Sequence, residues 1–114
     1  GKKELNIMKS DSVIINCSRG GIVNENDLIE ALRNNVIHST GLDVFSNEPL
    51  SKESPFFKLK NVIVTPHMAA QTKEAAAAMA TMAAKGVLDI LDNKKYEYVA
   101  NKEVYNHPKW RNIH

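Results

Sequence analysis

The sequence predicts an α/β protein built on a parallel β-sheet, and three observations support this class. Short apolar runs occur at residues 13–17, 40–45 and 62–65, and the first and last of them are rich in β-branched residues. Runs without polar alternation are typical of strands buried on both faces of a parallel sheet. Segments with helical spacing of apolar residues precede the first run, lie between the first and second runs, and follow the third. Strands that alternate with helices favour right-handed crossovers within one parallel sheet.

The first half of the chain is expected to form a helix, a strand, a helix and a strand. Residues 4–9 are the first helix, and a turn at 10–12 leads into the strand at 13–17. Asn24 is a good N-cap for the second helix, which runs to about Arg33. The strand at 40–45 contains Asp43, and a carboxylate within an apolar run is costly unless it has a partner.

The second half begins with a long loop, residues 46–60, of a length that is often functional in compact domains. The strand at 62–65 ends before Pro66, because proline has no N–H to donate. Thr72 caps a long helix over residues 72–92. We therefore expect one region over residues 1–93 and an irregular C-terminal tail at 94–114, docked through its aromatic side chains. Three parallel strands also leave faces and edges to cover, which indicates part of a larger domain.

Composition narrows the function classes. The chain has 114 residues, of which 43% are hydrophobic and 25% charged, so disorder is not indicated. A net charge of +2 is too weak to argue for nucleic acid. The most apolar region, residues 75–91, is interrupted by charged residues and is not a membrane span. Cys17 is the single cysteine, which favours a reducing, cytoplasmic location. No metal is expected, because His38, His107 and His114 lack metal-ligand spacing.

Polar side chains gather where the predicted strands end. These residues are Cys17, Ser18, Arg19, Asp43, Glu48 and His67. Parallel strands point the same way, so we expect these groups to converge on the sheet edge where open α/β sheets bind ligands. There is no Walker loop, GxGxxG or GxSxG motif.

Each of these groups has a possible chemical role and a simpler alternative. Arg19 can hold a carboxylate in a bidentate fork, or it can merely cap a loop. Glu48 can orient the His67 imidazole for proton transfer, or it can be a solvated loop charge beside a structural histidine. Asp43 can accept a hydrogen bond from an amide, or it can cap a neighbouring backbone. All of these simpler explanations would have to be true at the same time for residues at one edge of the sheet, here called the rim. Together they are therefore less attractive than each is alone.

Four motifs together resemble the D-isomer-specific 2-hydroxyacid dehydrogenases, a family that includes phosphoglycerate dehydrogenase. The motifs are NCSRGGIVN at residues 16–24, GLDVF at 41–45, Glu48-Pro49, and NVIVTPH at 61–67. They occur in the family's order and at compatible spacing, and the resemblance runs over residues 4–93. It implies the second half of a doubly wound, Rossmann-like NAD-binding domain, followed by a long C-terminal helix.

The resemblance also implies roles for the residues of the rim. Arg19 would bind the substrate carboxylate and carbonyl oxygen, and His67 would be the acid/base with Glu48 as its partner. Asp43 would hold the nicotinamide carboxamide. The full set implied to contact the cofactor is Cys17, Ser18, Arg19, Asp43, His67, Met68, Ala69 and Ala70. NADH would give a hydride to C2 of a small 2-keto acid while protonated His67 supplies the proton.

In the family, the glycine-rich phosphate loop and the acid that binds the adenosine ribose lie upstream of the residues present here. The resemblance therefore implies a chain that is inactive alone, a homodimeric full-length protein, and a cofactor that is NAD, with NADP left open. It implies no nucleic-acid or membrane partner. Two alternatives remain: an NAD-sensing protein like the transcriptional corepressors that resemble these enzymes, and a structural subdomain that mainly forms a dimer interface.

Overall fold

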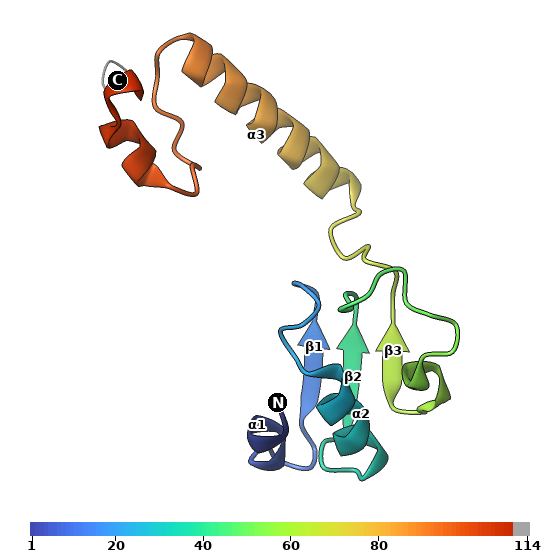
Figure 1. Cartoon of the computed structure of the whole chain (residues 1–114). Coiled ribbons are helices and arrows are strands. Elements are labelled where there is room, and N and C mark those ends of the chain that lie inside the picture. Colours follow the sequence, from blue (N-terminus) through green and yellow to red (C-terminus); the bar gives the residue numbers. More distant parts are fainter. Residues whose placement is uncertain (111–114) are drawn as a thin grey trace. The chain divides into compact units, whose positions relative to one another are not determined.

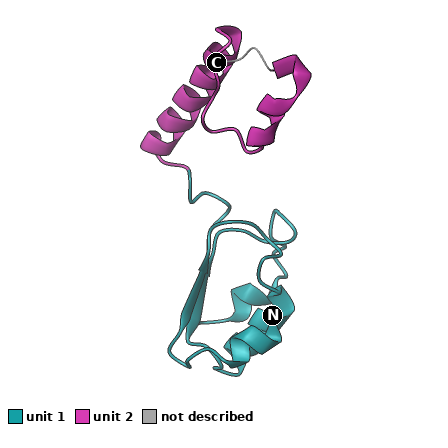
Figure 2. Cartoon of the chain, turned by 90° about the vertical axis from the view of Figure 1, so that its left-hand side faces the viewer, with its two compact units in different colours: residues 1–70 teal, residues 71–114 magenta. Residues whose placement is uncertain are grey.

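The computed structural model describes residues 1–110, and the chain divides into two compact units (Figure 1, Figure 2). The first unit is Gly1–Ala70, and the second begins at Gln71. All three strands and every candidate site residue belong to the first unit.

The first unit is built on a three-stranded parallel sheet in the order β1-β2-β3 (Figure 1). The strands are β1 (Val13–Asn16), β2 (Ser39–Leu42) and β3 (Val62–Val64). In register, Asn16 pairs with Leu42, and Leu42 pairs with Val64. The predicted parallel α/β class is confirmed, and the carboxyl ends of all three strands lie at one edge.

Strand β2 is shorter than the sequence predicted. We expected residues 40–45, but β2 ends at Leu42. Beyond that point Asp43 N still donates to Asn16 O at 3.0 Å, and then the chain leaves the ladder. Phe45 N donates to the Glu48 carboxylate at 2.8 Å instead of to a neighbouring strand. Residues 43–45 are therefore a buried loop rather than strand.

One helix precedes β1 in the chain and another follows it. Helix α2 (Glu25–Arg33) begins as predicted, with the Asn24 side chain accepting a hydrogen bond from Asp27 N at 3.0 Å. Helix α1 (Lys2–Asn6) lies earlier than the predicted residues 4–9. Its first turn is tied to α2, because Lys2 N donates to the Asp27 carboxylate at 2.8 Å. This contact between distant residues has no signature in local spacing.

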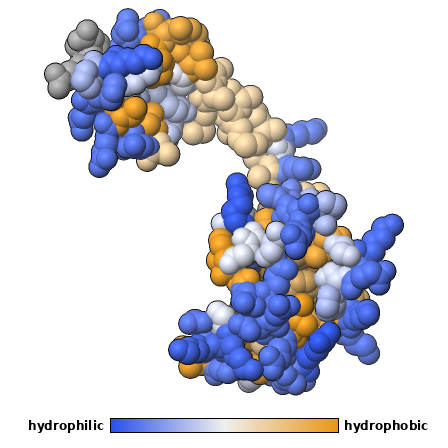
Figure 3. Space-filling view, in the orientation of Figure 1, coloured by the Kyte–Doolittle hydropathy of each residue, from blue (hydrophilic) through white to orange (hydrophobic). Residues whose placement is uncertain are grey.

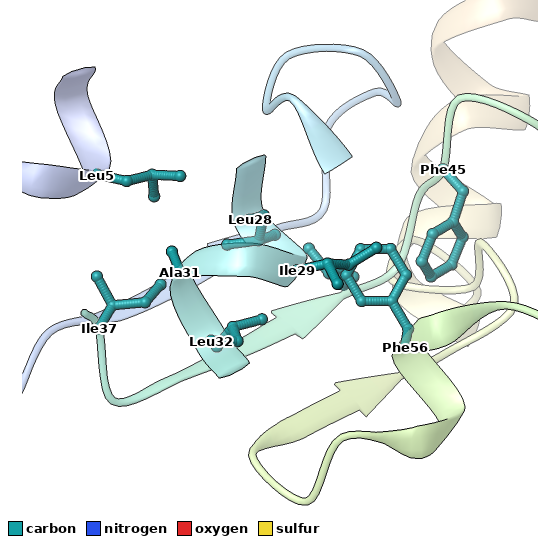
Figure 4. Packing of buried hydrophobic residues seen from close by; sticks show 9 residues of the cluster. Leu5, Leu28, Ile29, Ala31, Leu32, Ile37, Phe45 and Phe56 are labelled. Carbon is teal, nitrogen blue, oxygen red and sulfur yellow. The ribbon is translucent and has the colours of Figure 1, made fainter. Parts of the chain in front are cut away.

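The core lies between α1, α2 and one face of the sheet (Figure 4). Leu28 and Ile37 are fully buried there. The long loop predicted at 46–60 contains the 3-10 helix η1 (Pro55–Lys58), which places Phe56 against Phe45 with ring centroids 6.0 Å apart. The helices and this loop thus supply one continuous apolar layer under the sheet.

The opposite face of the sheet is not covered by the described residues of this unit. Figure 2 shows the unit's helices on one side of the strands only. Ile15 and Ile63 are 73% and 72% exposed, and they flank Gly41 in register. The expectation that the strands are buried on both faces is therefore wrong for this unit. Apolar runs predict burial, but the run alone does not say which segment supplies the cover.

The second unit contains the predicted long helix, α3 (Lys73–Leu91), capped by the Thr72 hydroxyl, which accepts from Ala75 N at 3.1 Å. Much of α3 has the pale orange of weakly hydrophobic alanine in Figure 3. None of its residues is buried. Within the described part of the chain, no helix is both long enough and apolar enough to cross a bilayer.

The segment after α3 folds back on that helix through aromatic side chains. The Tyr96 hydroxyl donates to Met82 O at 3.0 Å, and the Tyr105 hydroxyl donates to Tyr96 O at 3.1 Å. Two short 3-10 helices, η2 (Lys102–Asn106) and η3 (Pro108–Trp110), occur in the segment that we expected to be irregular. Residues 111–114 of the predicted tail lie outside the described residues.

Candidate active site

Three loops meet at the carboxyl edge of the sheet. Residues 17–20 follow β1, residues 43–48 follow β2, and residues 65–69 follow β3. This is the edge at which open α/β sheets bind ligands. The loops carry the predicted site residues. Hydrogen bonds join three of these residues, because His67 is bonded to both Glu48 and Asp43.

Glu48 and His67 form a hydrogen-bonded pair. Nδ1 of His67 lies 2.7 Å from Oε2 of Glu48, while Oε1 of Glu48 accepts from Phe45 N at 2.8 Å. The hydrogen bond from His67 and then the one from Phe45 lower the pKa of Glu48 below its ordinary value. An ionised carboxylate only accepts, so Nδ1 of His67 carries the hydrogen of this bond. Nε2 is then the ring nitrogen that remains for a ligand.

The backbone of His67 is held in an unusual conformation. Its φ is 52°, in the left-handed region that few residues other than glycine adopt. His67 N donates to Asp43 O at 2.8 Å. Asp43 therefore fixes the position at which the imidazole leaves the sheet.

Asp43 is buried at 3% exposure and is surrounded by donors. Oδ1 accepts from the Thr65 hydroxyl and from Met68 N at 2.9 Å, and Oδ2 accepts from Ala69 N at 2.8 Å. These bonds, that from Thr65 first, lower the pKa of Asp43 below its ordinary value. The carboxylate expected inside an apolar run thus has its partners. Its role toward a nicotinamide carboxamide stays a prediction.

Arg19 lies in the loop after β1 with Cys17 and Ser18, and all three are exposed. The Arg19 guanidinium donates to Ser18 O at 2.7 Å. No hydrogen bond joins Arg19 to Glu48 or His67 in the described part of the chain. The guanidinium is therefore available to a ligand at the cost of one local hydrogen bond.

The segment after His67 leaves the rim with exposed side chains. Met68 is 45% exposed, and Ala69 and Ala70 are also exposed. Asp43 holds Met68 and Ala69 by their N–H groups, whereas Ala70 N makes no hydrogen bond to Asp43 within residues 1–110.

A hollow of about 630 Å³ opens beside the Glu48–His67 pair. Its lining is mostly apolar and consists of Phe45, Glu48, Pro49, Leu50, Phe57, Val64, Thr65, Pro66 and His67. Small-molecule sites commonly have this size and character, with a few polar groups on apolar walls.

Two residues of this edge were not assigned a role from the sequence. Thr65 anchors Asp43, and Asn16 bonds to the loop that carries Arg19. The sequence signal that could have identified both residues is a polar side chain at the end of an apolar strand. Spacing alone does not tell which backbone groups such a side chain meets.

The family of the chain follows from comparison with known proteins. The sequence profile described as "D-isomer specific 2-hydroxyacid dehydrogenase, NAD binding domain" matches residues 1–69. The chain belongs to the D-isomer-specific 2-hydroxyacid dehydrogenase family. The resemblance drawn from the four motifs is thereby confirmed.

Curated members of this family are similar over most of the chain. Glyoxylate/hydroxypyruvate reductase B of Klebsiella pneumoniae is 40% identical over 104 residues, which cover 91% of this chain and 32% of that protein. D-3-phosphoglycerate dehydrogenase of Methanocaldococcus jannaschii is 41% identical over 101 residues, 89% of this chain and 19% of that protein. The chain thus spans about a third, or less, of the length of these 2-hydroxyacid dehydrogenases.

Solved structures of the family also match. D-lactate dehydrogenase with NAD+ from Lactobacillus jensenii has a TM-score of 0.75 and 29% identity, covering 90% of this chain and 34% of that one. The NADPH-dependent glyoxylate/hydroxypyruvate reductase of Sinorhizobium meliloti, in complex with NADP and malonate, has a TM-score of 0.76 and 31% identity. That match covers 87% of this chain and 31% of that one.

Proposed function

We propose that the full-length gene product containing this chain is an oxidoreductase that interconverts small 2-keto acids and 2-hydroxy acids with NAD(H) or NADP(H). The observation that carries this proposal is the 2.7 Å hydrogen bond between His67 Nδ1 and Glu48, at the sheet edge that also carries the Arg19 loop. The names of the similar proteins support it, since they are a glyoxylate/hydroxypyruvate reductase, a phosphoglycerate dehydrogenase and a lactate dehydrogenase.

In this proposal His67 moves the proton. Glu48 holds Nδ1, so Nε2 gives a proton to the carbonyl oxygen during reduction and takes it back during oxidation. The lowered pKa of Glu48 keeps its carboxylate ionised at neutral pH. The ionised carboxylate accepts the hydrogen on Nδ1 and thereby fixes the tautomer and orientation of the imidazole.

Arg19 would bind the substrate carboxylate. A guanidinium presents parallel N–H groups that match both oxygens of a carboxylate. The Arg19 side chain is exposed and bonded only to Ser18 O among the described residues, so a carboxylate can replace that contact.

The nicotinamide, when bound, would supply or accept the hydride at C2 of the substrate. Asp43 would hold its carboxamide, between Cys17, Ser18 and Arg19 on one side and His67, Met68, Ala69 and Ala70 on the other. A carboxylate offers about four acceptor positions. Asp43 uses three of them within the described chain, which leaves one on Oδ2 for an amide N–H. Matching structures contain NAD+ in one case and NADP in another.

The proposal also covers the oligomeric state and the cellular location of the full-length protein. We infer a homodimer in the cytoplasm, because the family resemblance implies a dimer and the exposed, unpaired Cys17 thiol suits a reducing compartment. Light scattering of the purified full-length protein would test the dimer.

The test compares two histidine variants in the full-length gene product. NADH and NADPH absorbance is followed with glyoxylate, hydroxypyruvate, pyruvate and 3-phosphohydroxypyruvate. We expect His67→Ala to lower kcat by about 10² to 10⁴-fold, the range for general acid–base catalysis. His38→Ala is the matched control, because His38 is an exposed histidine just before β2, at the opposite end of the sheet.

The outcomes distinguish a dehydrogenase from an NAD-sensing protein without enzymatic activity. Turnover that is lost in His67→Ala and kept in His38→Ala supports the dehydrogenase and identifies the acid that it prefers. Binding of NADH with no turnover of any acid would reject the enzyme in favour of an NAD-sensing, corepressor-like protein.

A further inference from the structure

The loop that carries Arg19 is closed by the side chain of Asn16, the last residue of β1. Asn16 is 8% exposed, and both ends of its amide are used. Oδ1 accepts from Ser18 N at 3.1 Å, and Nδ2 donates to Arg19 O at 3.0 Å. The Asn16 carbonyl also accepts from Asp43 N at 3.0 Å. One buried residue thus joins the Arg19 loop to the loop that anchors His67.

Gly20, the residue after Arg19, is pressed against the second loop. A Cβ added at Gly20 would lie 2.1 Å from the carbonyl carbon and oxygen of Phe45 and 2.5 Å from Ser46 N. No side chain fits there unless the peptide between Phe45 and Ser46 moves. That peptide belongs to the loop held by Glu48, which accepts from Phe45 N.

These contacts bracket Arg19. Its carbonyl is fixed from one side by Asn16, and its next residue is seated on the Phe45–Ser46 peptide. We propose that Asn16 and Gly20 are positioning residues that fix the Arg19 backbone relative to the loop carrying Glu48, so that a substrate carboxylate on Arg19 presents its neighbouring carbonyl to His67. The effect on catalysis rests on the proposed function. The fixing of the Arg19 backbone by Asn16 and Gly20, here called the anchoring, does not depend on it.

The first test measures turnover in the full-length gene product. Asn16→Ala removes both amide contacts, and Gly20→Ala forces the Phe45–Ser46 peptide to move. A displacement of about 1 Å at a reacting group can cost about a hundredfold in rate. We therefore expect both variants to lower kcat/KM for the keto acid by about a hundredfold. Part of this loss should be a raised KM, because Arg19 binds the carboxylate.

Matched controls sit elsewhere in the same sheet. Asn61 also bridges backbone groups, donating to Leu32 O at 3.3 Å and His38 O at 3.0 Å, but at the amino end of β3. Asn61→Ala therefore removes similar hydrogen bonds away from the site. At Gly41 an added Cβ would meet Ile15 at 3.8 Å, an ordinary contact, so Gly41→Ala is the glycine control. Both controls should keep kcat/KM within about threefold.

The second test needs no turnover. Trypsin cleaves after arginine, and cleavage at Arg19 requires the loop to open. Loss of the two Asn16 hydrogen bonds should accelerate cleavage at Arg19 by about tenfold relative to wild type. Asn61→Ala should leave that rate unchanged. The sites are read by mass spectrometry of the digested full-length protein.

The two tests give separable results. If the wild type turns over no keto acid while Asn16→Ala speeds cleavage at Arg19, the proposed function fails and the anchoring stands. If Asn16→Ala and Gly20→Ala match their controls in kcat/KM, or if Asn16→Ala matches Asn61→Ala in trypsin cleavage at Arg19, the positioning role is rejected. Gly20→Ala decides the matter if Asn16→Ala does not fold.

Discussion

At the scale of single residues, the candidate site depends on two carboxylates with different surroundings. Glu48 is partly exposed and shared between His67 and one backbone N–H. Asp43 is buried and accepts from one hydroxyl and two N–H groups. Hydrogen bonds lower the pKa of both, so both are ionised at neutral pH. This is why we propose His67, rather than either carboxylate, as the group that transfers the proton.

The lowered pKa of Asp43 makes a prediction about stability and pH. A carboxyl whose pKa is lower in the folded state stabilises the fold above its unfolded value, 3.8 for Asp43, and loses this contribution as pH falls through the folded pKa. Asp43→Asn lacks that contribution. We expect the gap in unfolding free energy between wild type and Asp43→Asn to be constant near neutral pH and to shrink below about pH 4.

Urea unfolding in pH steps measures this gap. Asp11→Asn, which changes an exposed carboxylate in the turn before β1, is the control. A gap that persists unchanged to about pH 2 would contradict the inferred hydrogen-bonded state of Asp43.

At the scale of elements, the strands and helices were predictable where the signal is local. Helix α2 and its Asn24 cap were predicted to the residue, because a cap is a contact between residues close in sequence. The end of β2 was not, because Asp43 and Phe45 find backbone and side-chain partners in other loops. The convergence of Glu48 and His67 on one edge was predictable from parallel topology. The hydrogen bond from Asp43 N to Asn16 O was not predicted, since it joins the ends of two different strands.

The Asn24 cap gives a prediction at this scale. Asn24→Ala leaves Asp27 N without its side-chain acceptor at the start of α2. Such a loss typically costs about 1 kcal/mol of unfolding free energy. Asn26→Ala, two residues later and exposed within the same helix, is the matched control and should cost less than about 0.5 kcal/mol. Chemical denaturation compares the pair, and equal costs would show that the cap contributes nothing.

At the scale of the whole molecule, the chain carries the residues proposed for proton transfer and substrate binding, His67 and Arg19, but contains no GxGxxG motif. A glycine-rich turn at a helix N-terminus is what usually binds the cofactor pyrophosphate. The sheet also leaves Ile15 and Ile63 uncovered in the first unit. The 114-residue chain is therefore expected to need the remainder of a family domain in order to act.

This expectation has a direct measurement. The isolated 114-residue chain, mixed with NADH and the keto acid that the full-length protein prefers, should leave the absorbance of NADH unchanged. The full-length protein at equal concentration is the positive control. Steady oxidation by the isolated chain, abolished in its His67→Ala variant, would show that this expectation is wrong.

The parallel pairing of the strands also determines when contacts of the site form during folding. Met68 N and the Asp43 carboxylate are 25 residues apart in sequence, and Thr65 and Asp43 are 22 apart. Contacts between such distant residues form late, because the intervening chain must be ordered first. The Glu48–His67 pair thus comes together only when β2 and β3 are already side by side. A spectroscopic signal from that pair during refolding would therefore report the pairing of β2 with β3.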